Sequence, residues 1–221
     1  SKYHFRQNRK QDREPVRLFT GSFSIDAMIW HEDQLYFGHG GGTEEVASGK
    51  IIAKTENRVH AFAIYKNHFI ASDFCRIYEP LSEKILADKK VLPVHSPSFD
   101  HVGTMTEHKG KLYFGGYSAR SKSGVFKLGR TRPIKAFPSP VSAFASLDDV
   151  LYLQYGMIQG AFPTSDGNCY IAGLEDDFSY SFDRQIWNMI AHQSKLLCSG
   201  YFDGLLEIDT KTKTRCRFLE K

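Results

Sequence analysis

Few carboxylates in this sequence are placed where they could serve as a general acid and a base. Glycoside hydrolysis needs two such groups flanking one bond, and one of them must donate a proton. Asp26 and Asp100 each stand at the start of an apolar run, so they could meet at the mouth of a central channel if those runs are strands that line it. Aspartate is also favoured wherever it caps a turn. We therefore predict no catalytic carboxylate, and an enzyme is the less favoured interpretation.

Other reactive groups form no stronger pattern. Ser142 and His60 could act as nucleophile and base, but nothing in their placement specifies such a pair. The nine histidines show no HxH or HExxH spacing, so we predict no metal site. Residues His39–Ser48 read HGGGTEEVAS, which lacks the GxxxxGK of a phosphate-binding loop and carries two glutamates that would repel phosphate. A flexible hairpin loop is expected there, and no cofactor is predicted.

The elements that must position these residues are short strands, because one phrase recurs along the chain about every 40 residues. Each copy places a small residue before a large apolar one, and a second apolar run follows between turn residues. Short runs of β-branched and aromatic residues between turn residues are typical of antiparallel strands. The recurring pairs are Ala27-Met28, Ala61-Phe62, Thr104-Met105, Ala143-Phe144 and Asn188-Met189.

A period of this length with several short strands is typical of a β-propeller blade, and no 3.6-residue helical pattern competes with it. The sequence thus predicts an all-β fold. The favoured architecture is a β-propeller of five blades, each with three to four antiparallel strands. The large residue of each pair should fill the space between neighbouring blades. Residues 15–221 are expected to form this one domain. A closed ring of five blades is favoured, because an open array would leave apolar faces unpaired at each end, and membership of a larger ring stays open. The first blade is expected to have three strands, because no outer strand fits between Lys54 and Val59.

Positive charge gathers at the N-terminus. The first 17 residues hold six Lys or Arg against two Asp or Glu, an excess equal to the net charge of +4 of the whole chain. We expect residues 1–14 to form a flexible basic arm. Such an arm could dock on RNA, DNA or an acidic protein, although a solvated tail without a partner would have the same composition.

Cysteine usage and hydropathy bear on the compartment. The four cysteines have no CxxC spacing and most stand inside apolar runs, so buried free thiols are expected. No apolar stretch is long enough to cross a membrane, and the N-terminus shows no signal-peptide segment. These features predict a cytoplasmic, intracellular protein without a membrane partner.

Two segments carry a family resemblance. LYFGGY followed by GVFKL at 112–128, and LLCSGY followed by GLLEID at 196–209, resemble blades of the WD-repeat and quinoprotein-like propeller group. The resemblance covers about residues 16–219 and implies the architecture. Five-bladed rings are also similar to glycoside hydrolase and sucrase-type propellers, which keeps a carbohydrate-acting or carbohydrate-binding protein as an alternative. In that case Trp187 would stack on a sugar ring.

The favoured function is a non-catalytic propeller scaffold that binds a macromolecular partner, either a protein or a ribonucleoprotein, through loops on one face. An RNA-associated factor that binds through its basic arm is a further alternative. The contact face should lie where the inner strands begin, because the connections between blades emerge there. The candidate binding residues at this face are Asp26, His60, Asp100, His101, Arg120 and Trp187.

Overall fold

Twenty β-strands and no helix make up the part of the chain that the computed structural model describes. The described residues are 24–73, 76–88, 101–117, 123–156, 168–182, 186–200 and 205–218. The strands form five antiparallel sheets of four strands each. We number them sheet 1 to sheet 5 in chain order. This confirms the all-β class and the five repeated units.

The strands of sheets 1 to 3 begin and end as follows. Sheet 1 contains β1 (Ala27–His31), β2 (Gln34–His39), β3 (Gly42–Glu45) and β4 (Lys50–Lys54). Sheet 2 contains β5 (Ala61–Tyr65), β6 (His68–Ser72), β7 (Ile77–Glu79) and β8 (Lys84–Ala87). Sheet 3 contains β9 (His101–His108), β10 (Lys111–Tyr117), β11 (Gly124–Lys127) and β12 (Lys135–Ala136).

The strands of sheets 4 and 5 follow the same plan. Sheet 4 contains β13 (Val141–Leu147), β14 (Val150–Tyr155), β15 (Cys169–Gly173) and β16 (Ser179–Phe182). Sheet 5 contains β17 (Ile186–His192), β18 (Lys195–Gly200), β19 (Leu205–Asp209) and β20 (Thr214–Phe218). In every sheet the strands pair in chain order, so each sheet is a simple meander.

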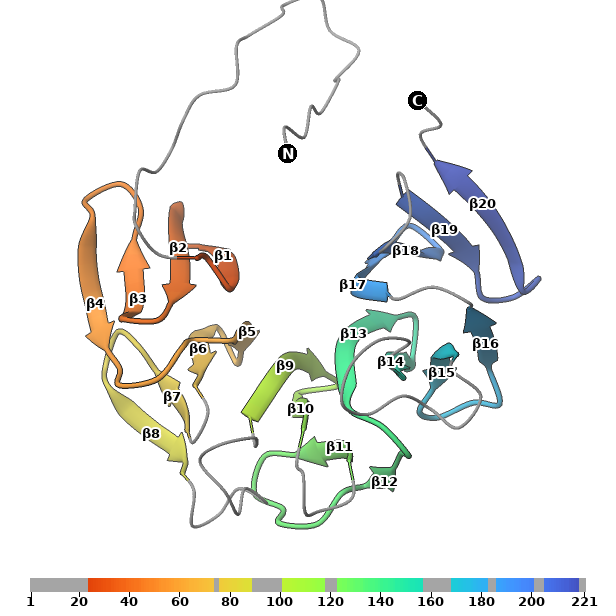
Figure 1. Cartoon of the computed structure of the whole chain (residues 1–221), viewed down its shortest axis with the longest axis horizontal. Coiled ribbons are helices and arrows are strands. Elements are labelled where there is room, and N and C mark those ends of the chain that lie inside the picture. Colours follow the sequence, from red (N-terminus) through yellow and green to blue (C-terminus); the bar gives the residue numbers. More distant parts are fainter. Residues whose placement is uncertain are drawn as a thin grey trace, which may run out of the picture.

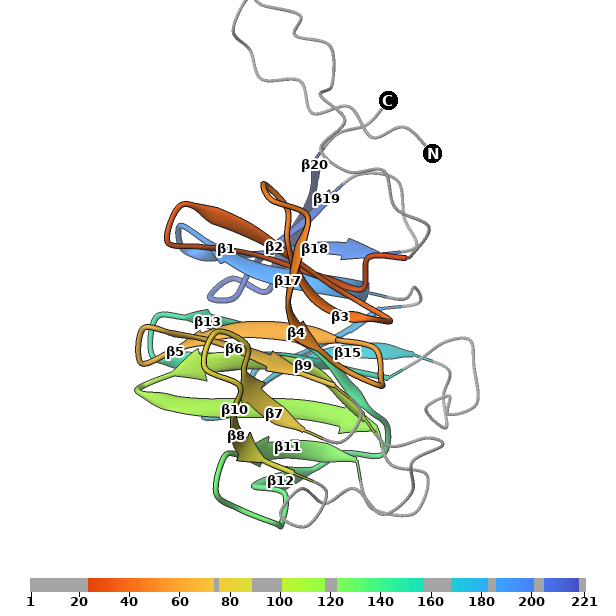
Figure 2. The ribbon, with the colours of Figure 1, turned by 90° about the vertical axis from the view of Figure 1, so that its left-hand side faces the viewer.

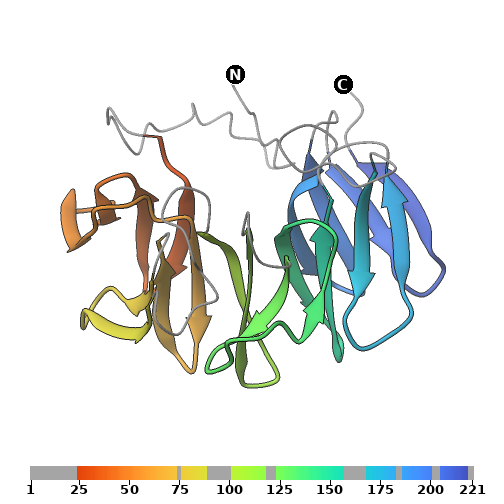
Figure 3. The ribbon, with the colours of Figure 1, turned by 60° about the horizontal axis from the view of Figure 1, so that its bottom comes forward.

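The five sheets follow one another around an arc, with the first strand of each sheet nearest the middle (Figure 1). Side views show the strands of all sheets crossing the molecule from one end to the other (Figures 2 and 3). β1 and β17 lie at the two ends of the arc, and no described strand lies between them (Figure 1).

The inner strands all point in the same direction. Ser72, beside the start of β5, donates a hydrogen bond to the carbonyl oxygen of Val102 near the start of β9, over 3.0 Å. His108 and Ser146, at the far ends of β9 and β13, are also joined. We name the end where the inner strands begin the top end and the opposite one the bottom end.

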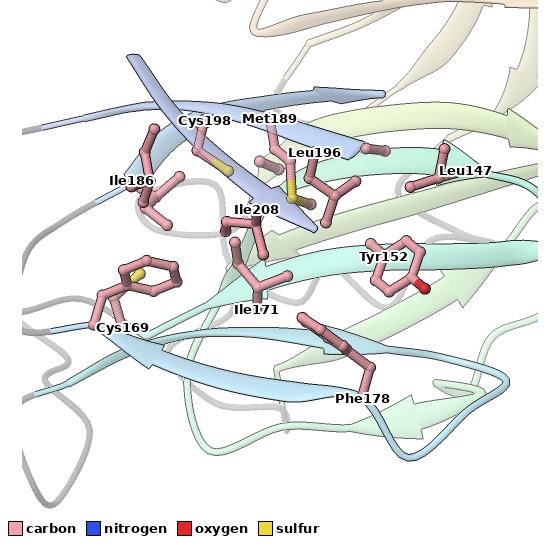
Figure 4. Close-up of a cluster of buried hydrophobic side chains, with 14 residues drawn as sticks. Leu147, Tyr152, Cys169, Ile171, Phe178, Ile186, Met189, Leu196, Cys198 and Ile208 are labelled. Carbon is pink, nitrogen blue, oxygen red and sulfur yellow. The ribbon is translucent and has the colours of Figure 1, made fainter. Parts of the chain in front are cut away.

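Neighbouring sheets are held together by a repeated pairing of small and large apolar side chains. Between sheets 4 and 5, Met189 packs in one buried cluster with Ala143 and Ala145 (Figure 4). Between sheets 2 and 3, Met105 packs in the same way with Ala61 and Ala63. The large residue of each pair thus faces the preceding sheet, and the small residues face the following one. This confirms the predicted role of the recurring pair at these junctions.

Met28 departs from this rule. Its counterparts Met105, Phe144 and Met189 are 7%, 8% and 4% exposed, whereas Met28 is 65% exposed. The expectation that every large residue of the pair is wedged between sheets is therefore wrong for Met28. The physical reason is its place at the start of the arc, where no described sheet precedes it.

Sheet 1 also corrects the expected strand count, because it has four strands. The glycine-rich segment that we expected as a flexible loop contains β3, which pairs with both β2 and β4. Gly42 makes this pairing possible, because it has a φ of +134° and a Cβ there would lie 2.1 Å from the carbonyl oxygen of Ala53.

The basic arm expected at residues 1–14 lies outside the described residues and stays a prediction. So do Cys75 and the predicted site residues Asp100 and Arg120. Within the described ranges, no helix has the length and hydropathy that a membrane crossing requires.

The contributions of Met105 and Met28 to stability can be compared in one experiment. Met105→Ala should lower the free energy of unfolding by about 2–4 kcal/mol, because a buried side chain between two sheets is replaced by a cavity. Met28→Ala, at the equivalent position of sheet 1, should change it by no more than about 0.5 kcal/mol. Urea unfolding followed by circular dichroism measures both. Equal losses in the two variants would contradict the packing rule.

Candidate functional site

A polar cluster lies at the top end between sheets 1 and 2. Arg58, three residues before the start of β5, places its Nε 3.3 Å from Oδ2 of Asp26, just ahead of β1. Its guanidinium also donates a hydrogen bond to the hydroxyl of Ser24. The Asp26 amide donates to the Gly38 carbonyl over 2.9 Å, which extends the β1–β2 pairing by one residue pair. Half of the Arg58 side chain is exposed, whereas the Asp26 side chain is 20% exposed.

His60 lies beside this ion pair. Its amide donates to the Ser72 carbonyl over 2.9 Å, so the residue is fixed at the start of β5. Burial lowers the pKa of His60 most strongly; the carboxylates of Asp26 and Asp73 oppose this effect and the Arg58 guanidinium adds to it. The imidazole is therefore neutral at neutral pH, and it presents one donor and one acceptor.

A second ion pair stands in the β6–β7 connection of sheet 2. Arg76 donates from Nε and Nη2 to Oδ2 of Asp73 over 2.9 and 2.6 Å, and its amide donates to Oδ1 over 2.9 Å. The Asp73 side chain is fully buried, whereas that of Arg76 is 34% exposed. The guanidinium also lies over the Tyr78 ring, 5.3 Å from its centre. Burial raises the pKa of Tyr78 to about 12, so its phenol stays protonated.

The charged groups of this cluster are engaged with one another. Both carboxylates near His60 are paired with a guanidinium, Asp26 with Arg58 and Asp73 with Arg76. Half of the Arg58 side chain is exposed, so its guanidinium can also contact a partner at the top end. Among the described residues, no group of three or more His, Cys, Asp or Glu is arranged to hold a metal ion.

The structure brings together two of the six predicted site residues, Asp26 and His60. Trp187 lies in β17 of sheet 5, at the other end of the arc, and is 43% exposed. His101 is the first residue of β9, but its side chain is not described. The sequence reasoning missed Arg58, Asp73 and Arg76. Only Arg58 could have been found, because it stands three residues ahead of Ala61, where one of the recurring strands starts.

Ser142 and His60 stand on sheets that are not neighbours. Ser142 belongs to sheet 4 and donates its hydroxyl hydrogen bond to Oε1 of Gln154 on the adjacent strand. His60 belongs to sheet 2, and sheet 3 stands between the two.

A different serine and histidine meet at the bottom end. His108 Nδ1 lies 2.8 Å from the Ser146 hydroxyl, and its Nε2 lies 3.4 Å from Oε1 of Glu175. The other oxygen of Glu175 accepts from the Leu151 amide over 2.8 Å. His108 is 2% exposed, so its ring is enclosed between sheets 3 and 4. The three side chains therefore link sheets 3 and 4 through polar contacts.

Two of the thiols are buried and free, as expected. Cys169 and Cys198 are both fully buried in the cluster between sheets 4 and 5 (Figure 4). Burial raises the pKa of Cys198 to about 12, and the neighbouring Cys169 adds to the effect. Burial also raises the pKa of Cys169, which accepts a 2.7 Å hydrogen bond from the Gln154 side chain. Neither sulfur is a thiolate at neutral pH, so neither is a nucleophile.

Comparison with known proteins shows a fold and no family. No protein-family model matches the chain, and no curated protein matches it in sequence. A chain in a crystal structure of the mitotic checkpoint complex matches with a TM-score of 0.61 and 13% identity, over 91% of this chain and 68% of that one. The computationally designed Ika8 protein matches with a TM-score of 0.55 and 11% identity, over 86% of this chain and 59% of the designed one.

A third match is bacterial. The extracellular domain of the hybrid two component system BT4673 from B. thetaiotaomicron gives a TM-score of 0.57 and 12% identity, over 93% of this chain and 29% of that one. At such identities the matches show the fold alone. Together with the five repeated sheets, they define an all-β protein with a propeller-like arrangement.

The buried ion pair of sheet 2 can be tested by truncation. Asp73→Ala should lower the free energy of unfolding by about 1–3 kcal/mol, because the Arg76 amide and guanidinium lose their acceptor. Asp149→Ala is the control, since that side chain is 95% exposed and 3.8 Å from its partner Lys109. We expect no measurable change there. Chemical unfolding checks both, and a neutral result for Asp73→Ala would show that the pair contributes nothing.

The raised thiol pKa values predict slow alkylation and an alkaline loss of stability. In the folded chain, iodoacetamide at pH 8 should leave Cys169 and Cys198 unmodified, as read by peptide mass spectrometry, and urea should expose both. An unfolded thiol ionises near its ordinary pKa of 9.0, whereas folded Cys198 ionises near about 12. The unfolded chain therefore binds fewer protons between these values, and stability should fall as pH rises through this window. Cys198→Ala should reduce that fall; an unchanged slope would contradict the assignment.

Proposed function

We propose that this chain is a five-bladed β-propeller module, related to the WD-repeat and quinoprotein-like group, that acts as a non-catalytic scaffold. In this proposal the top end binds a protein or ribonucleoprotein partner. The repeated meander sheets and the propeller-like solved structures support the architecture. One of those structures is a multi-protein complex, which is compatible with a scaffold role for such a fold.

The observation that carries the proposal is the preorganised guanidinium of Arg58. Asp26 and Ser24 hold it in place, yet half of the side chain stays exposed. Arginine and tryptophan are enriched among the residues that dominate binding energy at protein interfaces. A guanidinium that is already fixed loses less conformational entropy when a partner binds.

The same contacts argue against sugar hydrolysis at this site. Hydrolysis of a glycosidic bond needs two carboxyl groups that flank the bond. Asp26 is engaged by Arg58, and Asp73 is fully buried and engaged by Arg76, so neither is placed to flank a bound sugar. The recognition role is therefore the better fit to the described residues.

Partner capture with matched arginine variants tests the proposal. The full chain is immobilised and incubated with native lysate, and proteins recovered at a constant ratio to the bait are identified by mass spectrometry. Arg58→Ala should lose such a partner, because its fixed donor at the top end is removed. Arg130→Ala should retain it, since this exposed arginine lies in the β11–β12 connection at the bottom end.

Two results would contradict the proposed binding face. One is equal recovery of the partner by both variants. The other is the absence of any protein recovered at a constant ratio by the unaltered chain. Circular dichroism of each variant shows whether a loss of binding reflects a loss of fold.

A further inference from the structure

Charge is divided unevenly between sheets 3 and 4. The described part of sheet 3, residues 101–117 and 123–137, holds six Lys or Arg against one Glu. The described part of sheet 4, residues 141–156 and 168–182, holds five Asp or Glu and no Lys or Arg. Surfaces typically intersperse charges of both signs. Two neighbouring sheets of opposite sign therefore indicate a surface with a specific use.

Most of these charged groups are exposed at the bottom end of the molecule. Both connections of sheet 3 at this end carry exposed cations, and both connections of sheet 4 there carry exposed carboxylates (Figure 3). The basic patch of sheet 3 consists of Lys109, Lys111, Arg130 and Arg132. The acidic patch of sheet 4 consists of Asp148, Asp149, Glu175, Asp176 and Asp177. All four connections lie within the described residues.

The two patches adjoin, but most of their charge is not used within the chain. Lys109 donates from Nζ to the Asp149 carbonyl oxygen over 2.6 Å, and the same Nζ lies 3.8 Å from Oδ1 of Asp149. The other three residues of the basic patch form no ion pair within the described part of the chain. Nor do Asp148, Asp176 and Asp177 of the acidic patch. These groups are therefore available to a partner.

The two patches share the same order from the middle of the arc outwards. In each sheet the first hairpin joins the two strands nearest the middle, and the connection between the last two strands lies in the outer part (Figure 1). The inner positions are held by Lys111 and Asp148, and the outer positions by Arg130 and Asp177. A basic row and an acidic row thus run side by side along the junction of sheets 3 and 4.

A half turn about this junction makes the surface its own complement. An axis that lies along the junction, in the plane of the bottom end, places a second copy face to face with the first. Sheet 3 of each copy then lies opposite sheet 4 of the other. Distances from the middle are unchanged by this rotation, so inner cations face inner carboxylates and outer cations face outer ones. Self-complementarity under a two-fold axis is what a symmetric dimer interface requires.

We propose that the bottom ends of sheets 3 and 4 bind the same surface of a second copy of this chain, with each basic patch facing the acidic patch of the other copy. Charge complementarity across an interface fixes its register and disfavours wrong partners. A single exposed ion pair contributes little, whereas a network of several contributes more. The dimer is therefore reversible and weakens as salt screens the charges. The proposal concerns the end opposite the top-end site and does not rest on the proposed function.

A nucleic acid fits this surface less well. Its phosphates would be attracted by the basic patch. The acidic patch directly beside it would repel them, and Lys109 at the boundary is already engaged by Asp149. An acidic protein segment would likewise use only half of the surface. A second copy carries both signs in the arrangement that the two patches need.

Two matched charge-reversal variants of the full chain test this inference. The first combines Lys111→Glu with Arg130→Glu, and the second combines Asp148→Lys with Asp177→Lys. Each variant reverses one inner and one outer charge of one patch. Asp148 has a φ of 51°, and Lys109 holds the equivalent turn position of sheet 3 with a φ of 49°, so a lysine is accommodated there. Circular dichroism checks the fold of each variant before association is measured.

Sedimentation velocity over a concentration series measures the dimer. The unaltered chain should dimerise at low salt and dissociate at about 1 M NaCl, where the Debye length falls to about 3 Å. Each variant alone should raise the dissociation constant by about tenfold or more, because like charges then face each other. An equimolar mixture of the two should dimerise again, to within about threefold of the unaltered chain, because every introduced acid then faces an introduced base. Lys54→Glu, at the top end of β4, is the control and should change nothing.

Several outcomes would overturn the proposal. These are a monomer at every concentration in low salt, equal dimerisation of the unaltered chain and both variants, and no dimer in the mixture. Binding of an RNA oligonucleotide to a monomeric chain, with loss of binding in the first variant, would assign the basic patch to a nucleic acid instead. Arg58→Ala should leave the dimer unchanged, so a failure of the top-end function is distinguishable from a failure of this inference.

Discussion

Contact between large apolar side chains of one sheet and small side chains of the sheet before it is the interaction on which this structure depends. Backbone hydrogen bonds join strands within a sheet, but they cannot join one sheet to the next across its face. That task falls to clusters such as the one formed by Met189, Ala143 and Ala145. Burying one such side chain stabilises the fold by about 1.5–3 kcal/mol, so each junction is a substantial term.

Polar contacts across the junctions have a different role. The hydrogen bond from Ser72 to the Val102 carbonyl and the one between His108 and Ser146 join fixed points on neighbouring sheets. Apolar packing alone tolerates small slides between two faces, whereas a directional contact specifies one alignment. These contacts therefore help to determine where the inner strands begin relative to one another. The top-end cluster inherits its geometry from that alignment, because Asp26 and His60 belong to different sheets.

Much of the fold could be read from the sequence because its signal repeats. Met105, Phe144 and Met189 occupy equivalent places, and each lies buried between sheets as the repeat predicts. The strand β3 was missed because glycines and glutamates lack the β-branched and aromatic signal of a strand. Its pairing depends on the backbone freedom of Gly42, which is visible only when the neighbouring carbonyl is known. The exposure of Met28 was missed because a repeat pattern does not state which unit lacks a neighbour.

The candidate site was only partly readable. Asp26 and His60 could be placed together from register, since each stands at the start of an inner strand. Asp73 and Arg76 meet through the shape of a connection, and connection geometry leaves little trace in sequence. Ser142 and His60 share a register position but not a neighbourhood, because sheet 3 separates their sheets. The position of a residue in the repeat thus predicts how far it lies from the top end. It does not predict which residues of other sheets lie beside it.

The linear order of the sheets determines the order in which they unfold. Each sheet is built from consecutive strands, and the main contacts between sheets in the described part of the chain join sheets that are neighbours in sequence, so cooperativity passes from neighbour to neighbour. Among the described residues, sheets 2, 3 and 4 are supported on both sides, whereas sheets 1 and 5 are supported on one. The terminal units should therefore open first, with the shortest amide-exchange lifetimes, while the central unit unfolds only with the whole. An arc of this kind has a graded stability from middle to ends, unlike a closed ring in which every unit is equivalent.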